Sequence, residues 1–78
     1  MTFRIIKVLK YRGCRVYLRN IDDVFEYLAI IRGEIYAAHI RIKKKFFQKE
    51  YTKVQFEKAT SIIERMAEAT IENALGIK

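Results

Sequence analysis

The sequence predicts an α+β fold: a four-stranded antiparallel β-meander within residues 3–45, with one long C-terminal helix, residues 53–75, packed on one face. Three observations support this prediction. β-forming residues dominate the first part of the chain, two Arg-Gly pairs divide them as turns would, and an unbroken helical pattern fills the last third. With 78 residues, the chain is expected to be a single domain spanning 1–78.

The first hairpin is predicted from residues 3–11 and 14–20, which are rich in β-branched and aromatic side chains. Arg12-Gly13 separates them, and glycine tolerates the positive φ that a tight hairpin turn needs. The second segment alternates between two faces, with one set of side chains on each. These sets are Cys14, Val16 and Leu18 against Arg15, Tyr17 and Arg19.

A second hairpin is predicted from residues 24–31 and 35–43, on either side of Arg32-Gly33. A two-residue turn there pairs aromatic residues with aliphatic or small ones on one face, as good cross-strand packing requires. The expected pairs are Phe25 with Ile40, Tyr27 with Ala38, and Ala29 with Tyr36, and on the other face Glu26 with His39.

Residues 21–32 also fit a helix, because their apolar residues recur at helical spacing and Gly33 would end it. This alternative gives the order β-hairpin, helix, strand, helix. The hairpin explains more residues, since 38–43 alternates strictly as a strand, but the sequence leaves both open.

The final element is a helix that begins with a capping box, Thr52 to Gln55, and runs to Leu75, with Gly76 as its stop. Its apolar face is expected to cover the sheet, and glutamates occupy the opposite face. The covering residues are Phe56, Ala59, Ile62, Ile63, Met66, Ala67, Thr70 and Ala74, and the glutamates are Glu57, Glu64, Glu68 and Glu72.

Composition indicates which classes of protein to consider. Cys14 is the only cysteine and His39 the only histidine, so no intrachain disulfide, metal site or cofactor is expected. Neither residue has a predicted partner for nucleophilic catalysis, so the chain is expected not to be an enzyme. The lone cysteine and the lack of a long apolar run favour a full-length cytoplasmic protein with no membrane role. The Ile, Lys, Arg and Glu content is typical of thermophile proteins.

The charge is unevenly distributed. Residues 1–51 carry 12 Lys or Arg and 5 Asp or Glu, whereas residues 52–78 carry 4 of each. Such asymmetry indicates a partner of negative charge, although a solvated lysine-rich surface explains it equally well. A second basic cluster is formed by Arg41, Lys43, Lys44, Lys45 and Lys49. The meander brings residues 43–45 near Asp22 and Asp23, which would neutralise part of this cluster.

Nucleic-acid binding is the first functional hypothesis. Basic side chains around an aromatic ring on the uncovered sheet face and at the turn tips suit phosphate contacts and base stacking without strong sequence specificity. The candidate residues are Lys10, Arg12, Arg15, Tyr17, Arg19, Arg32, Arg41 and Lys43.

A homodimeric structural or protein-interaction module with no nucleic-acid role is the alternative. The uncovered face is expected to expose more apolar surface than a monomer normally leaves wet, and the acidic helix face of one subunit could meet the basic hairpin of another. The expected dimer contacts are Ile6, Val8, Leu28, Ile30, Ile35 and Ala37. No small-molecule substrate is implied, and the sequence does not distinguish DNA, RNA or an acidic protein as the partner.

Overall fold

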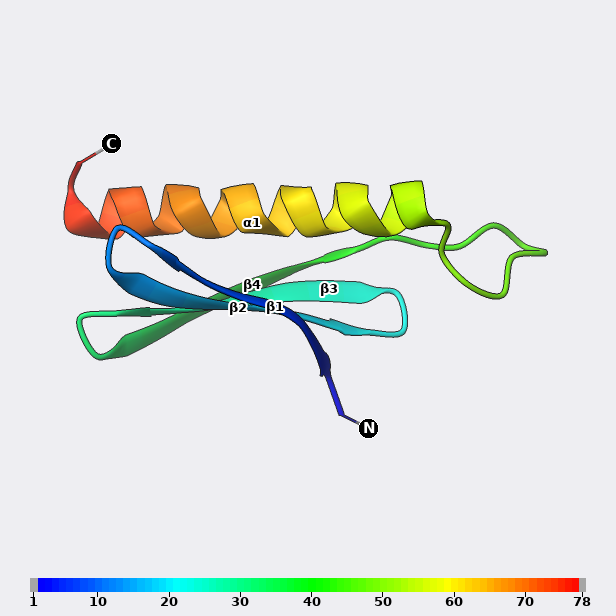
Figure 1. Cartoon of the computed structure of the whole chain (residues 1–78), viewed down its shortest axis with the longest axis horizontal. Coiled ribbons are helices and arrows are strands. Elements are labelled where there is room, and N and C mark those ends of the chain that lie inside the picture. The colour runs from blue at the N-terminus through cyan, green and yellow to red at the C-terminus, as the bar shows by residue number, and fades with distance from the viewer. Residues whose placement is uncertain (1, 78) are drawn as a thin grey trace.

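The computed structural model, which describes residues 2–77, confirms the predicted meander and C-terminal helix (Figure 1). The strands pair antiparallel in the order β1-β2-β3-β4, so neighbours in the chain are neighbours in the sheet. The alternative with a helix at 21–32 is wrong, because that segment contributes a strand to both neighbouring ladders. The elements are β1 (Arg4–Tyr11), β2 (Cys14–Ile21), β3 (Val24–Ile31), β4 (Glu34–Arg41) and α1 (Lys53–Leu75).

Two-residue turns determine the register of the sheet. Both central residues of each Arg-Gly turn have positive φ, 49° and 83° at Arg12 and Gly13 and 52° and 81° at Arg32 and Gly33. This is the backbone of a type I′ turn, whose twist matches that of the strands it joins. The pairings follow as predicted, with Phe25 opposite Ile40, Tyr27 opposite Ala38, Ala29 opposite Tyr36 and Glu26 opposite His39.

An irregularity in β1 shifts its alternation. The register with β2 changes between Ile5 and Lys7, so Ile5 lies opposite Arg19 and Lys7 lies opposite Leu18. An extra residue of this kind reverses the facing of the side chains on one side of it. Ile6, expected on the uncovered face, is instead half-buried and packs against the core.

The core lies between α1 and the covered faces of β2 and β3. The helix contributes four buried residues at a spacing of four: Ala59, Ile63, Ala67 and Ile71. Alternating alanine with isoleucine lets the helix axis approach the sheet closely. The strands contribute Cys14, Val16, Leu18, Phe25, Tyr27, Ala29 and Ile31.

The buried face of the helix is rotated slightly from the predicted one. Ile71 is fully buried although the sequence analysis did not place it on the core face, and Ile62, expected in the core, is 43% exposed. The predicted capping box is present, since Thr52 Oγ1 accepts from the Gln55 N–H at 3.1 Å and Gln55 Oε1 accepts from the Thr52 N–H at 2.9 Å. Gly76, with φ 74°, ends the helix.

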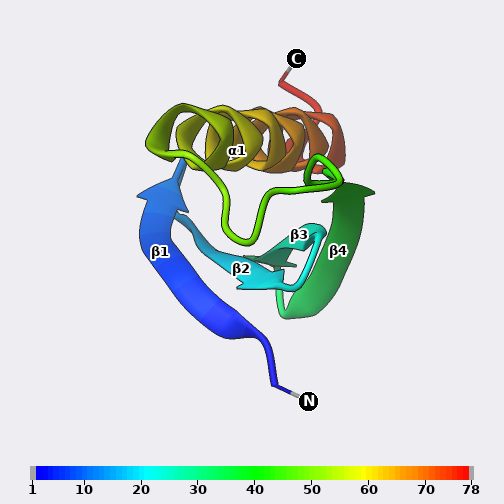
Figure 2. The same ribbon diagram turned by 90° about the vertical axis from the view of Figure 1, so that its right-hand side faces the viewer.

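The sheet curls around the helix. Figure 2 shows β1 and β4 rising on either side of α1, with β2 and β3 beneath it. The concave face therefore holds the helix, and the convex face is left uncovered. Both Arg-Gly turns lie at the C-terminal end of α1, while the Asp22-Asp23 turn and residues 42–52 lie at its N-terminal end (Figure 1). In the part of the chain that the structure describes, no helix combines the length and apolar character needed to span a bilayer.

Candidate nucleic-acid interface

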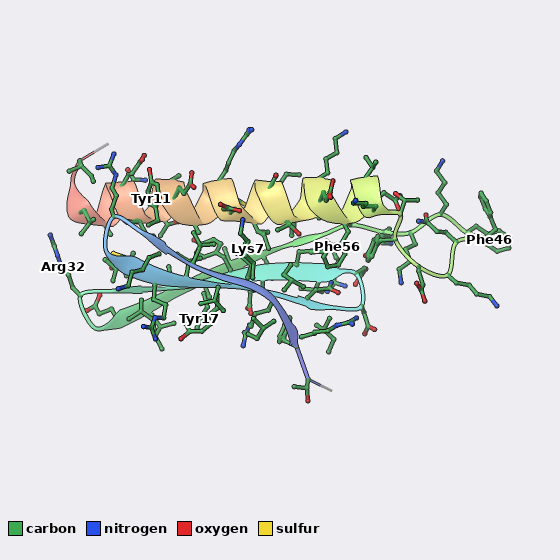
Figure 3. All side chains as sticks on the ribbon, viewed as in Figure 1. Lys7, Tyr11, Tyr17, Arg32, Phe46 and Phe56 are labelled. Atoms are coloured by element: carbon green, nitrogen blue, oxygen red, sulfur yellow. The ribbon has the colours of Figure 1, made fainter. Side chains whose placement is uncertain are left out.

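The convex face has a basic corner at its Arg-Gly end. Lys10 on β1 lies directly opposite Arg15 on β2, and both side chains are exposed. Arg32, at the tip of the β3–β4 turn, is exposed at the same end of the sheet (Figure 3). Within residues 2–77 none of the three forms an ion pair. Like charges directly opposite in a strand pair are destabilising, so an anion bound between Lys10 and Arg15 relieves a repulsion that is built into the hairpin.

Arg19, another candidate on this face, is held by its own chain. Its Nε donates to Glu26 Oε1 at 2.8 Å, and a second guanidinium nitrogen reaches the same oxygen. Its guanidinium carbon lies 4.4 Å from the centre of the Phe3 ring, in cation–π geometry. A phosphate would have to displace Glu26 to reach the guanidinium. Arg19 therefore serves mainly to stabilise the sheet and is poorly placed to bind a ligand.

Arg12 and Arg41 also have acidic neighbours. Arg41 Nη1 lies 3.1 Å from Asp23 Oδ1, and Arg12 Nε lies 3.8 Å from Glu72 Oε2. Like Arg19, these two arginines are therefore less available for phosphate than the residues of the basic corner. Asp23 thus neutralises Arg41, one member of the second basic cluster, while within residues 2–77 the lysines at 43–45 form no ion pair with it.

The acidic helix face meets the basic first hairpin within one chain. Because the β1 irregularity turns Lys7 toward the helix, its Nζ reaches Glu64 Oε1 at 3.0 Å (Figure 3). Tyr11 Oη donates to Glu72, and this hydrogen bond raises the pKa of the tyrosine against the opposing effect of Arg12. A second subunit is therefore not required to bring these charges together.

Tyr17 occupies the middle of the convex face (Figure 3). It is half-buried, and its cross-strand neighbours are Val8 on β1 and Leu28 on β3. The ring therefore belongs to an apolar stripe that crosses the sheet, with the basic corner beside it. Ala37 on β4 completes the stripe.

Several apolar side chains of the convex face, within the stripe and beyond it, are open to solvent. Ile5, Val8 and Ile35 are exposed, with Ile35 at 66%. Among the expected dimer contacts, Leu28 and Ile30 are half-buried and Ala37 is exposed, whereas Ile6 packs on the core side.

Residues 42–52, named here the lysine loop, carry a feature that the sequence analysis did not single out. Phe46 and Phe47 are the most exposed large apolar residues in the described chain, and Figure 3 places Phe46 at the far end of the loop. Lys43, the last nucleic-acid candidate, is exposed in the same segment. The sequence signal that could have identified this segment is the pair of adjacent phenylalanines among lysines, outside any helical or strand pattern.

Cys14 and His39 are far from forming a catalytic pair. Cys14 is buried on the covered face, and its Sγ lies 3.9 Å from the carbonyl oxygen of Arg12. His39 is exposed on the other face, opposite Glu26. Within residues 2–77 no group of three or more His, Cys, Asp or Glu is placed to hold a metal ion.

Comparison with known proteins adds no assignment. No protein family matches the chain. Searches against curated proteins and against solved structures also find no match. Function is therefore argued from the geometry of this chain alone.

Proposed function

We propose that the protein binds nucleic acid without strong sequence specificity. The observation that carries the proposal is the set of exposed basic side chains that have no ion-pair partner within residues 2–77. Arg12, Arg19 and Arg41 are partly or fully neutralised, but two groups of cations without an ion pair in the described chain lie at the two ends of the molecule. These are Lys10, Arg15 and Arg32 at one end and Lys43, Lys44, Lys45 and Lys49 at the other; Lys44 alone among them is half-buried, beside Tyr51.

A polyanion explains this arrangement better than solvation alone. The hairpin register holds Lys10 and Arg15 directly opposite each other, so the backbone cannot move the two like charges apart without breaking the strand pairing. Arg32 occupies a left-handed position, where asparagine or glycine is normally preferred. A phosphate backbone interacts favourably with such cations and releases its counterions on binding.

The test is the salt dependence of binding to a labelled mixed-sequence oligonucleotide, followed by fluorescence anisotropy. We expect micromolar binding at about 50 mM salt and weaker binding as salt rises. Each phosphate neutralised on a single strand contributes about 0.7 to the slope of log K against log salt, so Lys10→Gln/Arg15→Gln should lower this slope by about 1.4.

The matched control is Lys58→Gln/Arg65→Gln, which removes the same charge from exposed positions on the helix. We expect it to change the slope less than the sheet double variant does. Equal slopes for the two double variants would show that net charge, and not this surface, governs binding. Absence of binding at low salt would refute the proposal.

A homodimeric interaction module is the second candidate, favoured by the exposed apolar side chains of the convex face. Its occupant would be a second copy of this chain. Ile35→Glu is expected to dissociate the dimer, and Val54→Glu is the control, because Val54 is equally exposed, at 67%, but lies on the helix. A monomeric mass by light scattering from micromolar to millimolar concentration would contradict this candidate.

A further inference from the structure

The lysine loop projects from one end of the molecule and is closed at its base (Figure 1). The Ile42 N–H donates to the carbonyl oxygen of Asp23 at 2.8 Å, and Tyr51 Oη donates to the carbonyl oxygen of Ile42. Compact surface loops whose ends are tied in this way hold a defined shape and frequently carry function. The loop is therefore a fixed projection from the body of the protein.

The tip of the loop is a tight turn that presents two aromatic rings. The Gln48 N–H donates to the carbonyl oxygen of Lys45 at 2.9 Å, which makes Phe46 and Phe47 the central residues of the turn. The Gln48 side chain strengthens it by accepting from the Lys45 N–H at 3.1 Å. Phe46 and Phe47 are 104% and 79% exposed, so neither contributes to the core.

Exposure of two phenylalanines at such a turn has no benefit for folding. Burying one phenylalanine side chain normally stabilises the folded state by a free energy that is a large fraction of a small domain's net stability. Turn positions ordinarily carry glycine, asparagine, aspartate or serine. The aromatic pair therefore indicates a ligand that covers the rings.

The charge around the rings indicates that this ligand is an anion. Five lysines, at positions 43, 44, 45, 49 and 53, lie in or directly after the loop, with Glu50 as the single acid of this segment. Within residues 2–77 none of these lysines forms an ion pair. Lys44 Nζ lies 4.8 Å from the centre of the Tyr51 ring, which holds its charge close to the aromatic groups.

A hollow of about 480 Å³ lies between the loop tip and the start of α1. Phe47, Tyr51 and Lys45 line it, together with Glu50, Thr52 and the amide groups of Gln48 and Gln55. These amides bond to each other, to the loop backbone and to the helix cap, so their hydrogen-bonding capacity is largely used within the protein. Aromatic and charged contacts remain for a ligand, whereas these amides are not free to read a base edge.

We propose that the lysine loop is a site for single-stranded nucleic acid, in which unpaired bases stack on Phe46 and Phe47 and the lysines contact the flanking phosphates. This inference rests on the proposed function and specifies both its site and its substrate class. Base faces are open for stacking in a single strand and are covered in a duplex. The lack of free amide groups explains binding without sequence preference.

A lipid surface would also attract lysines and phenylalanines. The position of Phe47 favours a nucleic acid, because this ring lines the hollow beside Tyr51 and is less exposed than Phe46 at the tip. A bilayer would take up rings that point outward, whereas a stacked base fits between a ring and the start of the helix.

The test compares the wild type with Phe46→Ala/Phe47→Ala, using a labelled mixed-sequence oligonucleotide as a single strand and as a duplex. We expect the wild type to prefer the single strand, and the variant to bind it at least about 30-fold more weakly with an unchanged salt slope, since no charge is removed. Ile62→Ala/Ile77→Ala, which truncates exposed apolar residues on and just after the helix, is the control and should change the affinity by less than about twofold.

A second variant, Lys43→Gln/Lys45→Gln, should lower the salt slope by about 1.4. Equal affinity for single strand and duplex, unaffected by the phenylalanine variant, would overturn the inference and leave the proposed function intact. Binding to neither would overturn the proposed function itself. Loss of binding to vesicles of phosphatidylserine and phosphatidylcholine in the phenylalanine variant, with oligonucleotide affinity unchanged, would assign the loop to membranes and also overturn the inference.

Discussion

Substitution of Arg19 tests whether this arginine of the convex face stabilises the fold, whereas its neighbour Arg15 is available to bind nucleic acid. Arg19 was a nucleic-acid candidate on sequence grounds, yet the structure ties it to Glu26 and to the Phe3 ring. The two charged side chains are only 27% and 16% exposed, so water screens their interaction less than it would a surface pair. The perturbation is Arg19→Met, which keeps an apolar stem and removes the guanidinium.

The expected magnitude follows from what the substitution leaves behind. A hydrogen bond to a charged group contributes about 1.5–3 kcal/mol, and the cation–π contact adds about 0.5–1 kcal/mol at a partly exposed site. Partial exposure and the retained apolar stem reduce the sum. We expect the free energy of unfolding to fall by about 2 kcal/mol, which in a domain of this size lowers the melting temperature by roughly 8–16 °C.

The assay is urea unfolding followed by far-ultraviolet circular dichroism, with Arg15→Met as the control. Arg15 lies on the same strand and the same face, but it is exposed and has no ion-pair partner within residues 2–77. Its substitution should change stability by less than about 0.5 kcal/mol while weakening nucleic-acid binding. Equal destabilisation by the two variants would refute the reasoning, because Arg19 would then be an ordinary surface residue.

Three further predictions concern the core, a turn and a tyrosine. Ile63→Ala removes a fully buried side chain from the helix–sheet contact and should lower the free energy of unfolding by about 2–5 kcal/mol in urea titration; a decrease under about 1 kcal/mol would contradict the core assignment. Arg32→Asn should raise stability by about 0.5–1 kcal/mol, measured by thermal melting, because φ at this position is 52° and asparagine tolerates it better. The Glu72 hydrogen bond raises the pKa of Tyr11 above its ordinary value of 10.0, so the neutral phenol favours the folded state, and this contribution should disappear as pH rises through the folded-state pKa. Because the pKa values of Tyr36 and Tyr51 are raised as well, ultraviolet titration should show several late-ionising tyrosines, one of which returns toward the ordinary range in Glu72→Gln; an identical titration in that variant would exclude the contact.

The strand order and register could be predicted because the information that determines them is local. A two-residue Arg-Gly turn sets every cross-strand pair of its hairpin, and the alternation of side chains then assigns each residue to a face. The capping box at Thr52 and Gln55 likewise placed the start of the helix correctly. Each of these features depends on residues that are neighbours in the chain.

The side chains assigned to the wrong face are those whose facing depends on a distant part of the chain. The irregularity between Ile5 and Lys7 breaks the alternation with no glycine or proline to mark it, and its clearest consequence is the Lys7–Glu64 ion pair across 57 positions of sequence. The rotation that buries Ile71 and exposes Ile62 depends on how the helix sits in the curl of the sheet.

The candidate site was predicted in part. Basic residues on the uncovered face could be identified from alternation alone, but their ion pairs could not, because the partners Glu26, Asp23 and Glu72 lie on other elements. Phe46 and Phe47 were overlooked for a related reason. In a short chain, an adjacent aromatic pair is ordinarily buried, and only the structure shows that this turn points both rings away from the core.

Pairing every strand with its neighbour in the chain has a consequence for how the protein folds. Each ladder of the sheet closes a turn of only two residues, so little chain entropy is lost before the first contacts form. Docking of α1 onto β2 and β3 closes a much longer segment and is expected to be the slower event. Until the helix docks, the apolar side chains of the concave face are exposed to water. Slow docking therefore prolongs an intermediate that is prone to aggregation.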